Sequence, residues 1–402
     1  MMIERRRALH LAIVLMTAGA PAFAQRSQSR ITPATPTAAK SSTPVAPAPK
    51  PGPTISGHGP MTTAGLTPSA TADVKDGSVE YHLTGEPAIL SKHVRKQAGY
   101  GDVKGKLIHH GIKVTDWDQK RIGDCWLVSG VSAVAQKNPQ LVKDAIKSNN
   151  DGTYTVRLYV RDAQREQKDP RAPLVPVYVK VNDKVPLMDG KQIYAKGHNT
   201  HTNELWPAIV EKAAAQLRGG NYKKVVGGWG YVSMEMLTGQ KADRYDTRPS
   251  KSDQLFDVMK TASLEGRPMV AGTFSKKEFE ARLETIRKMD PQSPALREIL
   301  DLGGKAHTMQ IRGVVHGHAY TVLGVRETNG EKEVVLRNPW GKFEPPKGGF
   351  GHHRVERNGD GIFAMPMKHF ALVFRGVDVG TFSGPSPTAK LRNFASPSQP
   401  QN

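Results

Sequence analysis

The chain of 402 residues contains a single cysteine, Cys125. One thiol excludes an intramolecular disulfide, so the fold cannot depend on a disulfide framework. An odd cysteine is either a small buried hydrophobic residue or a reactive group, and its identity alone does not decide between them. The surrounding sequence must decide.

Acidic residues are scarce relative to basic ones. The chain has 37 Asp and Glu against 57 Lys and Arg, which gives a formal net charge of +20. The excess is spread along the chain rather than gathered in blocks, and no nucleic-acid-binding motif is recognisable. We therefore expect a soluble protein with a solvated basic surface and no nucleic-acid partner.

Long apolar runs are also missing. The apolar run Ala8 to Ala20 is shorter than the roughly 20 residues that span a bilayer. It follows the charged segment Glu4 to Arg7 and precedes Ala22-Phe23-Ala24, which is the order of a secretory signal peptide. This order predicts a signal peptide over residues 1–24, no stable membrane insertion after cleavage, and an exported protein, periplasmic or secreted. An uncleaved anchor is the alternative.

The remaining composition divides the chain. Residues 25–75 are rich in Pro, Ala, Ser and Thr, and residues 379–402 resemble them, so both are predicted to be disordered. The first segment is predicted to be a linker, a tether or a removable pro-segment. The folded part is expected to have two subdomains, residues 76–245 and 246–378.

Alternation and helical spacing predict the main elements of this folded part. The expected strands are 154–160, 177–181, 269–273, 314–326 and 333–337. The expected helices are 125–135, 206–217 and 255–264, with a charged helical hairpin over 276–302 that breaks at Pro291.

The segment Gln119 to Trp126 surrounds the cysteine. Asp124 is a good N-cap residue, and the small and apolar run Leu127 to Ala135 has helical spacing, so Cys125 is expected to open a helix. The positive end of a helix dipole favours a thiolate, which is the nucleophilic form of cysteine. The context therefore favours covalent catalysis.

Three further segments follow in sequence. They are Glu204 to Ala213, Gly317-His318-Ala319-Tyr320, and Arg337-Asn338-Pro339-Trp340-Gly341. Together with the cysteine segment, in this order, they resemble the calpain-type cysteine proteases of the papain-like superfamily over roughly residues 76–375. The resemblance suggests a bacterial exported member. It implies an α+β fold in which a helical subdomain that carries the cysteine faces a β-rich subdomain that carries the histidine and asparagine.

The resemblance also implies roles for individual residues. Cys125 would be the nucleophile, His318 the base, and Asn338 the residue that orients the imidazole. The Gln119 amide and the Cys125 backbone N–H would form the oxyanion hole. Trp340 would either cover the His–Asn pair or simply pack in the core.

Other histidines offer alternatives. His316 lies two residues before His318, on the same face if both belong to one strand, and is the rival base. The pairs His109 with His110, His198 with His201, and His352 with His353 have no partners at zinc-like spacing, so no zinc site is expected.

Calcium is the metal that the resemblance implies, with one ion in each half. Asp116 and Glu211 match the ligand carboxylates of the first half. In the second half Ile362 replaces a carboxylate, and the loop Lys342 to Lys347 is cationic. No EF-hand loop is present. We therefore expect at most one calcium ion, in the first half, and no required cofactor.

These features predict a calpain-like cysteine endopeptidase that cleaves proteins or peptides through a thioester acyl-enzyme and acts as a monomer. Two alternatives remain open. One is a catalytically weak or inactive binding protein of the cell envelope, and the other is a thiol acyltransferase that uses the same acyl-enzyme step.

Overall fold

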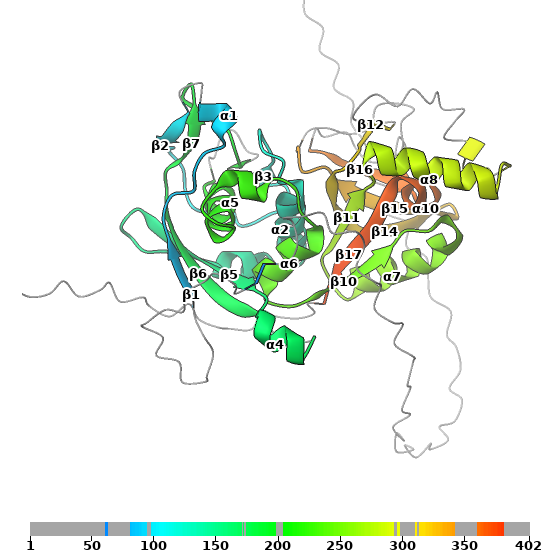
Figure 1. Ribbon diagram of the computed structural model, residues 1–402, viewed down its shortest axis with the longest axis horizontal. Helices are drawn as coiled ribbons and strands as arrows, with labels where there is room; N and C mark the ends of the chain where they lie inside the picture. The colour runs from blue at the N-terminus through cyan, green and yellow to red at the C-terminus, as the bar shows by residue number, and fades with distance from the viewer. Residues whose placement is uncertain are drawn as a thin grey trace, which may run out of the picture. The chain divides into compact units, whose positions relative to one another are not determined.

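The computed structural model describes residues 61–62, 81–94, 98–170, 172, 174–197, 204–292, 296–297, 310–311, 313–341 and 360–381. All of them fall within one compact unit that begins at Ile55. Helices and strands are mixed along the chain, so the α+β class is confirmed (Figure 1). The predicted signal peptide, most of the predicted linker and nearly all of the predicted tail lie outside the described residues.

Residues up to about position 240 build a four-stranded sheet and the helices beside it. The sheet order is β1-β6-β5-β4, with β6 parallel to β1 and antiparallel to β5. Its strands are β1 (Tyr81–Thr84), β4 (Ile146–Ser148), β5 (Thr153–Val160) and β6 (Val175–Asn182). Alternate residues of β6, from Val175 to Val181, are buried. The strands predicted at 154–160 and 177–181 are both confirmed, but only β6 alternates, because Thr155 to Leu158 of β5 are all buried.

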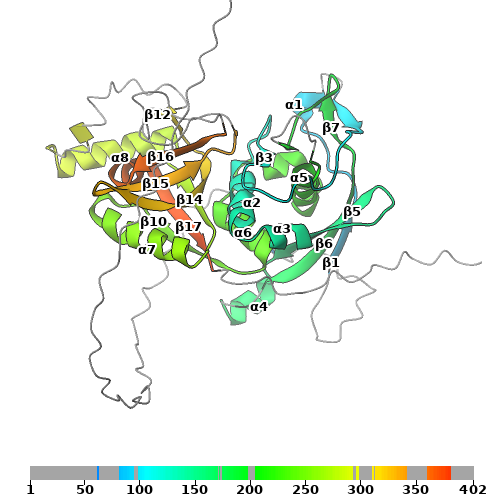
Figure 2. The ribbon, with the colours of Figure 1, turned by 180° about the vertical axis from the view of Figure 1, so that it is seen from behind.

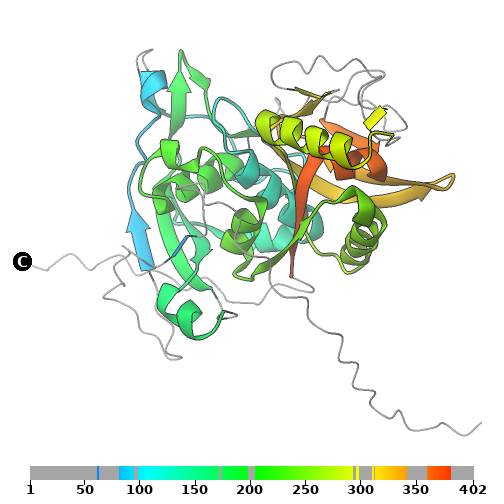
Figure 3. The same ribbon diagram turned by 45° about the vertical axis from the view of Figure 1, so that its right-hand side comes forward.

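Three helices share the hydrophobic core of this sheet. They are α2 (Cys125–Lys137), α5 (Trp206–Leu217) and α6 (Gly230–Thr238). α5 packs on β5 and β6, α6 packs on β5, and α2 packs on α6; Figure 3 shows these helices beside the sheet. Helix α6 ends at Gly239, whose φ of 74° is readily adopted by glycine. The helices predicted at 125–135 and 206–217 are confirmed.

The later part of the chain forms a six-stranded antiparallel sheet with its own core. Its order is β10-β17-β11-β14-β15-β16 (Figure 2). Helices α7 and α10 pack against it. The strands are β10 (Ala242–Asp246), β11 (Met269–Thr273), β14 (Ala319–Thr328), β15 (Glu331–Arg337), β16 (Ile362–Pro366) and β17 (Phe374–Gly380). The helices are α7 (Ser252–Leu264), α8 (Lys276–Met289) and α10 (Met367–Val373).

Shorter elements complete the described part. The helices are α1 (Ser91–Val94), α3 (Pro139–Asp144) and α4 (Ala163–Lys168), with 3-10 turns at Tyr222–Val225 and Pro249–Lys251. The short strands are β2 (Gly99–Gly101), β3 (Trp117–Asp118), β7 (Val185–Met188), β8 (Lys191–Gln192), β9 (Lys196–Gly197), β12 (Gln310–Ile311) and β13 (Val314–Val315).

The structure differs from the sequence prediction around the histidine segment. The predicted strand 314–326 is interrupted, because Gly317 adopts a φ of 59° and turns the chain between β13 and β14. His316 and His318 therefore do not share one strand face.

The boundary predicted at 245/246 falls inside β10, and β17 continues to Gly380, which pairs with Ala242.

Hydrogen bonds fix the cysteine helix against the sheet that carries the histidine. Ser129 Oγ in α2 donates to Ala319 O at 3.0 Å, and Thr321 Oγ1 in β14 donates back to Ser129 O at 2.9 Å. Gln119 N donates to Pro339 O at 2.8 Å. These bonds hold the cysteine segment beside the histidine and asparagine segments.

None of the helices in the described residues is long and apolar enough to cross a membrane.

Candidate active site

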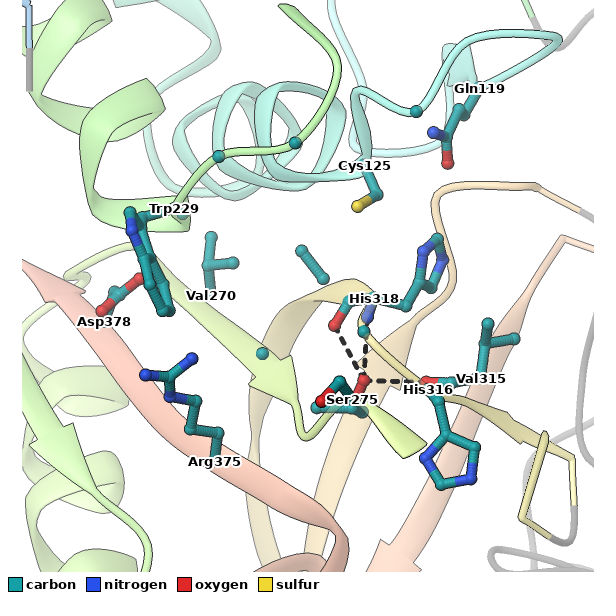
Figure 4. Close-up of a pocket in the computed structure, with 18 of the residues that line it drawn as sticks. Gln119, Cys125, Trp229, Val270, Ser275, Val315, His316, His318, Arg375 and Asp378 are labelled. Atoms are coloured by element: carbon teal, nitrogen blue, oxygen red, sulfur yellow. Dashed lines mark hydrogen bonds between the residues drawn. The ribbon is translucent and has the colours of Figure 1, made fainter. Parts of the chain in front are cut away.

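A cavity of about 570 Å³ opens between the start of α2, the loop before α6 and the edges of β11, β14 and β17 (Figure 4). The cysteine, histidine and asparagine segments predicted from the sequence all reach this cavity. The predicted residues that line it are Gln119, Cys125, His318 and Trp340. The rest of its wall comes from residues beside the cysteine, the loop before α6 and the later sheet: Lys120 to Gly123, Gly227 to Gly230, Arg244, Val270, Gly272, Thr273, Ser275, Glu278, Val315 to Gly317, Ala319, Arg375, Gly376 and Asp378.

Cys125 is the first residue of α2, as predicted, and its side chain is partly exposed to the cavity. Its neighbour Trp126 is fully buried, and the indole Nε1 donates to Val225 O at 2.8 Å. A Cβ on Gly228 would lie 2.5 Å from that indole, so the glycine allows the loop to pack closely on it. The bond to Val225 and the close packing of Gly228 together hold Trp126, and with it the start of α2, in place. Asp124 occupies the N-cap position but makes no capping hydrogen bond with its side chain.

The electrostatics of the thiol differ from the sequence expectation. The pKa of the Cys125 thiol is raised to about 11, mainly by burial and to a smaller extent by the charge of Asp124. Backbone hydrogen bonding, mainly from Ala319, lowers the pKa by less. The helix start was expected to favour the thiolate, but desolvation outweighs it in this cavity.

His318 and Asn338 form a defined pair. His318 Nε2 lies 3.0 Å from Asn338 Oδ1. The backbone N–H of Trp340 also donates to this Oδ1, at 3.1 Å, so the atom is an acceptor and the amide orientation is fixed by its network. Nε2 must therefore carry the imidazole proton. Nδ1 is left with its lone pair, as a base requires.

The backbone and ring of His318 are both constrained. Thr273 Oγ1 accepts from His318 N at 2.9 Å and donates to Val315 O at 2.8 Å (Figure 4). The Trp340 ring lies 5.0 Å from the imidazole, centroid to centroid, and the Tyr320 ring lies 5.1 Å away, edge-on. Burial lowers the pKa of His318 to about 4, against a smaller opposing effect of Asn338. The resting imidazole is neutral.

His316 lies in a different environment. It points away from Cys125 in Figure 4, and its Nδ1 lies 3.4 Å from Phe274 O. Its ring packs against Phe279, with centroids 5.5 Å apart. The turn at Gly317 separates the two histidines, so only His318 faces both the thiol and Asn338.

Gln119 is buried beside Cys125 and His318 (Figure 4). Its Nε2 donates to Ile122 O at 2.7 Å, across the turn that leads to the cysteine. Gln119 thus lines the same cavity as Cys125, with its side chain restrained by the turn.

The opposite wall was not found from the sequence. Two guanidinium groups lie over the Trp229 ring, Arg244 at 4.3 Å and Arg375 at 4.5 Å from its centroid. Arg244 Nε pairs with Asp378 at 2.9 Å, and Arg375 Nη1 pairs with Glu278 at 3.4 Å. These side chains come from four separate elements or loops: the loop before α6, β10, α8 and β17. No local sequence pattern could have joined them.

In a comparison with protein families, the sequence model of the calpain family cysteine proteases matches residues 95–380. The chain belongs to this family. Its match covers every described element from β2 to β17 and both segments that carry the His318–Asn338 pair.

Individual calpains resemble the chain more distantly. It is 27% identical over 296 residues to the calpain-type cysteine protease DEK1 of Zea mays, which covers 68% of this chain and 12% of the maize protein. It is 25% identical over 332 residues to calpain-9 of Mus musculus, covering 77% of this chain and 42% of the mouse protein. The chain thus spans less than half the length of these calpains.

The predicted calcium ligands of the first half each face a different carboxyl group. Asp116 Oδ2 accepts from Lys113 N at 2.6 Å and lies beside Glu204. Glu211 accepts from Ala195 N at 3.1 Å and lies beside Asp124. Burial raises the pKa of Glu204 to about 7 and that of Asp124 to about 6. The carboxyl pairs Asp116 with Glu204 and Glu211 with Asp124 are therefore easier to protonate than exposed carboxyl groups.

A calcium ion needs six to eight oxygen ligands, and a single site on Asp116 and Glu211 would require both carboxylates to face one point. No group of three or more Asp, Glu, His or Cys side chains that could hold a metal occurs in the described ranges. In this arrangement the two residues do not fit a shared calcium site. The histidines His198, His201, His352 and His353 lie outside the described residues.

Proposed function

We propose that this calpain-family chain is a cysteine endopeptidase in which Cys125, His318 and Asn338 act together. The observation that carries the proposal is the hydrogen bond of 3.0 Å from His318 Nε2 to Asn338 Oδ1, beside a cavity that Cys125 also lines. This bond leaves Nδ1 as the proton acceptor. Membership of the family supports hydrolysis of peptide bonds, and the chemistry of the pair supports the assignment of roles.

The first half of the reaction forms a thioester. His318 Nδ1 takes the proton of the Cys125 thiol as the sulfur attacks the carbonyl carbon of the substrate. The same nitrogen then gives the proton to the leaving amine, the C–N bond breaks, and the acyl group stays on the sulfur. Burial raises the pKa of the thiol and lowers that of the imidazole, which favours a proton transfer that accompanies the attack.

The second half releases the acid. Water gives a proton to His318 Nδ1 and attacks the thioester carbon. The C–S bond breaks, the carboxylic acid leaves, and the sulfur recovers its proton from the imidazole. Asn338 keeps the ring oriented throughout, and Trp340 shields the His–Asn hydrogen bond from water, as the distance of 5.0 Å between the rings allows.

Gln119 is the proposed side-chain donor of the oxyanion hole. The negative charge of both tetrahedral intermediates would lie between its amide and the backbone N–H of Cys125. One such donor contributes about 3 kcal/mol to lowering the barrier.

The two alternatives use the same cavity differently. An inactive envelope protein would bind polypeptides without cutting them, and an acyltransferase would pass the acyl group to an acceptor other than water. Incubation with an unstructured polypeptide and a thiol-reactive probe separates the three. We expect hydrolysis and labelling. A binding protein would cut nothing and form no covalent adduct with the polypeptide, whereas a transferase would form the acyl-enzyme adduct without hydrolysing it.

Two predictions about the whole protein remain proposals. We propose that the chain is exported and begins near Gln25 after cleavage, because of the order of charged, apolar and small residues at its start. N-terminal sequencing of exported protein tests this, and a start at Met1 would contradict it. We also propose a monomer that cleaves protein or peptide substrates.

A further inference from the structure

The cavity wall opposite His318 is organised around one indole. The guanidinium groups of Arg244 and Arg375 lie over the Trp229 ring, at 4.3 and 4.5 Å from its centroid, and Arg244 also lies over the Tyr231 ring at 4.8 Å. In Figure 4 the Arg375 side chain extends from its strand toward Trp229. Stacking on an aromatic face orients a guanidinium and restrains its rotation. Both groups are thus oriented before any substrate arrives.

The two carboxylates of this wall are already occupied. Asp378 Oδ2 accepts from Tyr231 N at 2.9 Å, and its Oδ1 pairs with Arg244 Nε at 2.9 Å. Asp378 is 7% exposed, so its charge is largely hidden from the cavity.

Glu278 is held by the start of α8. Its Oε2 accepts from Ser275 N at 2.9 Å and from Ser275 Oγ at 2.7 Å, which closes a capping box. Only Oε1 reaches Arg375, at 3.4 Å. The helix start therefore competes with Arg375 for this carboxylate.

The arginines retain donors. Among the described residues, each guanidinium makes a single ion pair, Arg244 through Nε and Arg375 through Nη1. Their side chains are 40% and 27% exposed. A guanidinium has five N–H donors and matches a carboxylate with two parallel hydrogen bonds. The unused donors line the same cavity as Cys125.

Resting on the function proposed above, we propose that Trp229, Arg244 and Arg375 form a specificity subsite for an acidic side chain of the substrate. The carboxylate of a substrate Asp or Glu binds the guanidinium of Arg375. The ion pair between Arg244 and Asp378 keeps Arg244 in place over the Trp229 ring. The net charge of +20 favours the encounter with acidic polypeptides.

The test is cleavage of a peptide library prepared from a denatured proteome, with residues on both sides of each cut counted. Wild type should enrich Asp and Glu over Asn and Gln about fivefold or more at one position, the scale of a partly exposed ion pair. Arg375→Met keeps the aliphatic packing and should remove the enrichment. Arg375→Glu should shift it toward Lys and Arg at the same position.

The matched control is Arg326→Met. Arg326 pairs with Glu333 at 2.8 Å and is 36% exposed, but it does not line the cavity. This variant loses the same charge and should keep the wild-type preference. Equal preference in wild type for acidic and amide side chains at every position, or a preference that survives in Arg375→Met, would overturn the inference.

A binding measurement separates this inference from the proposed activity. Two labelled peptide pools that differ only in Glu against Gln are titrated onto Cys125→Ala protein, with fluorescence anisotropy as the readout. The Glu pool should bind about fivefold more tightly, and Arg375→Met in the same background should equalise the two. Equal binding to Cys125→Ala would overturn the subsite. Absence of cleavage with a retained Glu preference would overturn only the peptidase.

Discussion

The resting thiol should react slowly with alkylating agents, and the rate should rise with pH up to about 10. The perturbation is pH, and the structural basis is the burial that raises the pKa of Cys125 to about 11. At pH 7 such a group is about 0.01% thiolate, against about 3% for a free cysteine with a pKa of about 8.5. The buried thiolate is the stronger nucleophile by roughly tenfold, since nucleophilicity rises with basicity. Alkylation should therefore be about 20- to 30-fold slower than that of an unfolded control.

Iodoacetamide labelling followed by intact-mass spectrometry measures this directly, because Cys125 is the only thiol in the chain. Protein in urea gives the free rate, and Cys125→Ser gives the background. The logarithm of the rate should rise by about one per pH unit from 7 to 10. A slow rate that levels off near pH 8.5 would indicate steric hindrance alone. A fast rate that is flat from pH 5 to 8 would indicate a preformed thiolate–imidazolium pair and would refute the argument.

Three further results are expected. Gln119→Ala should lower kcat about 10²- to 10³-fold without changing the rate of iodoacetamide labelling, because the lost donor acts on the oxyanion and not on the thiol; an equal fall in labelling would mean a structural role. Gly228→Ala should lower the free energy of unfolding by about 1–3 kcal/mol, because its Cβ would lie 2.5 Å from the Trp126 ring. In the control Gly99→Ala the new Cβ meets nothing within 4 Å, so the free energy of unfolding should change by less than about 0.5 kcal/mol. Urea titrations measure both values. Calorimetric titration with calcium should find at most one ion, and activity should persist at least partly in chelator; two bound ions would contradict this.

The sequence predicted elements whose pattern is local. The buried alternation of β6 follows from its valines, and the small apolar run after Cys125 determines α2. The partnership of His318 with Asn338 followed from resemblance to the calpains, because 20 residues separate them and only sheet register brings them together. The turn at Gly317 was missed, since two short strands flank it and read as one.

Properties that depend on burial could not be predicted in the same way. The start of a helix indicated a thiolate, but the depth of the cavity reverses the direction of the shift for Cys125. The subsite around Trp229 depends on contacts among residues 229, 244 and 375, which no sequence window contains. The partners of Asp116 and Glu211 likewise depend on which carboxyl group the fold places beside each.

The central claim is that Cys125 cuts peptide bonds with His318 as its base. The most direct measurement compares hydrolysis of an unstructured polypeptide by wild type, Cys125→Ala, His318→Ala and His316→Ala, each with its unfolding curve recorded. Cys125→Ala and His318→Ala should lose at least about a thousandfold in kcat/KM while they remain folded. His316→Ala should retain most activity, because its ring faces Phe274 and Phe279. Undiminished hydrolysis by folded Cys125→Ala, or loss in His316→Ala with retention in His318→Ala, would contradict the account.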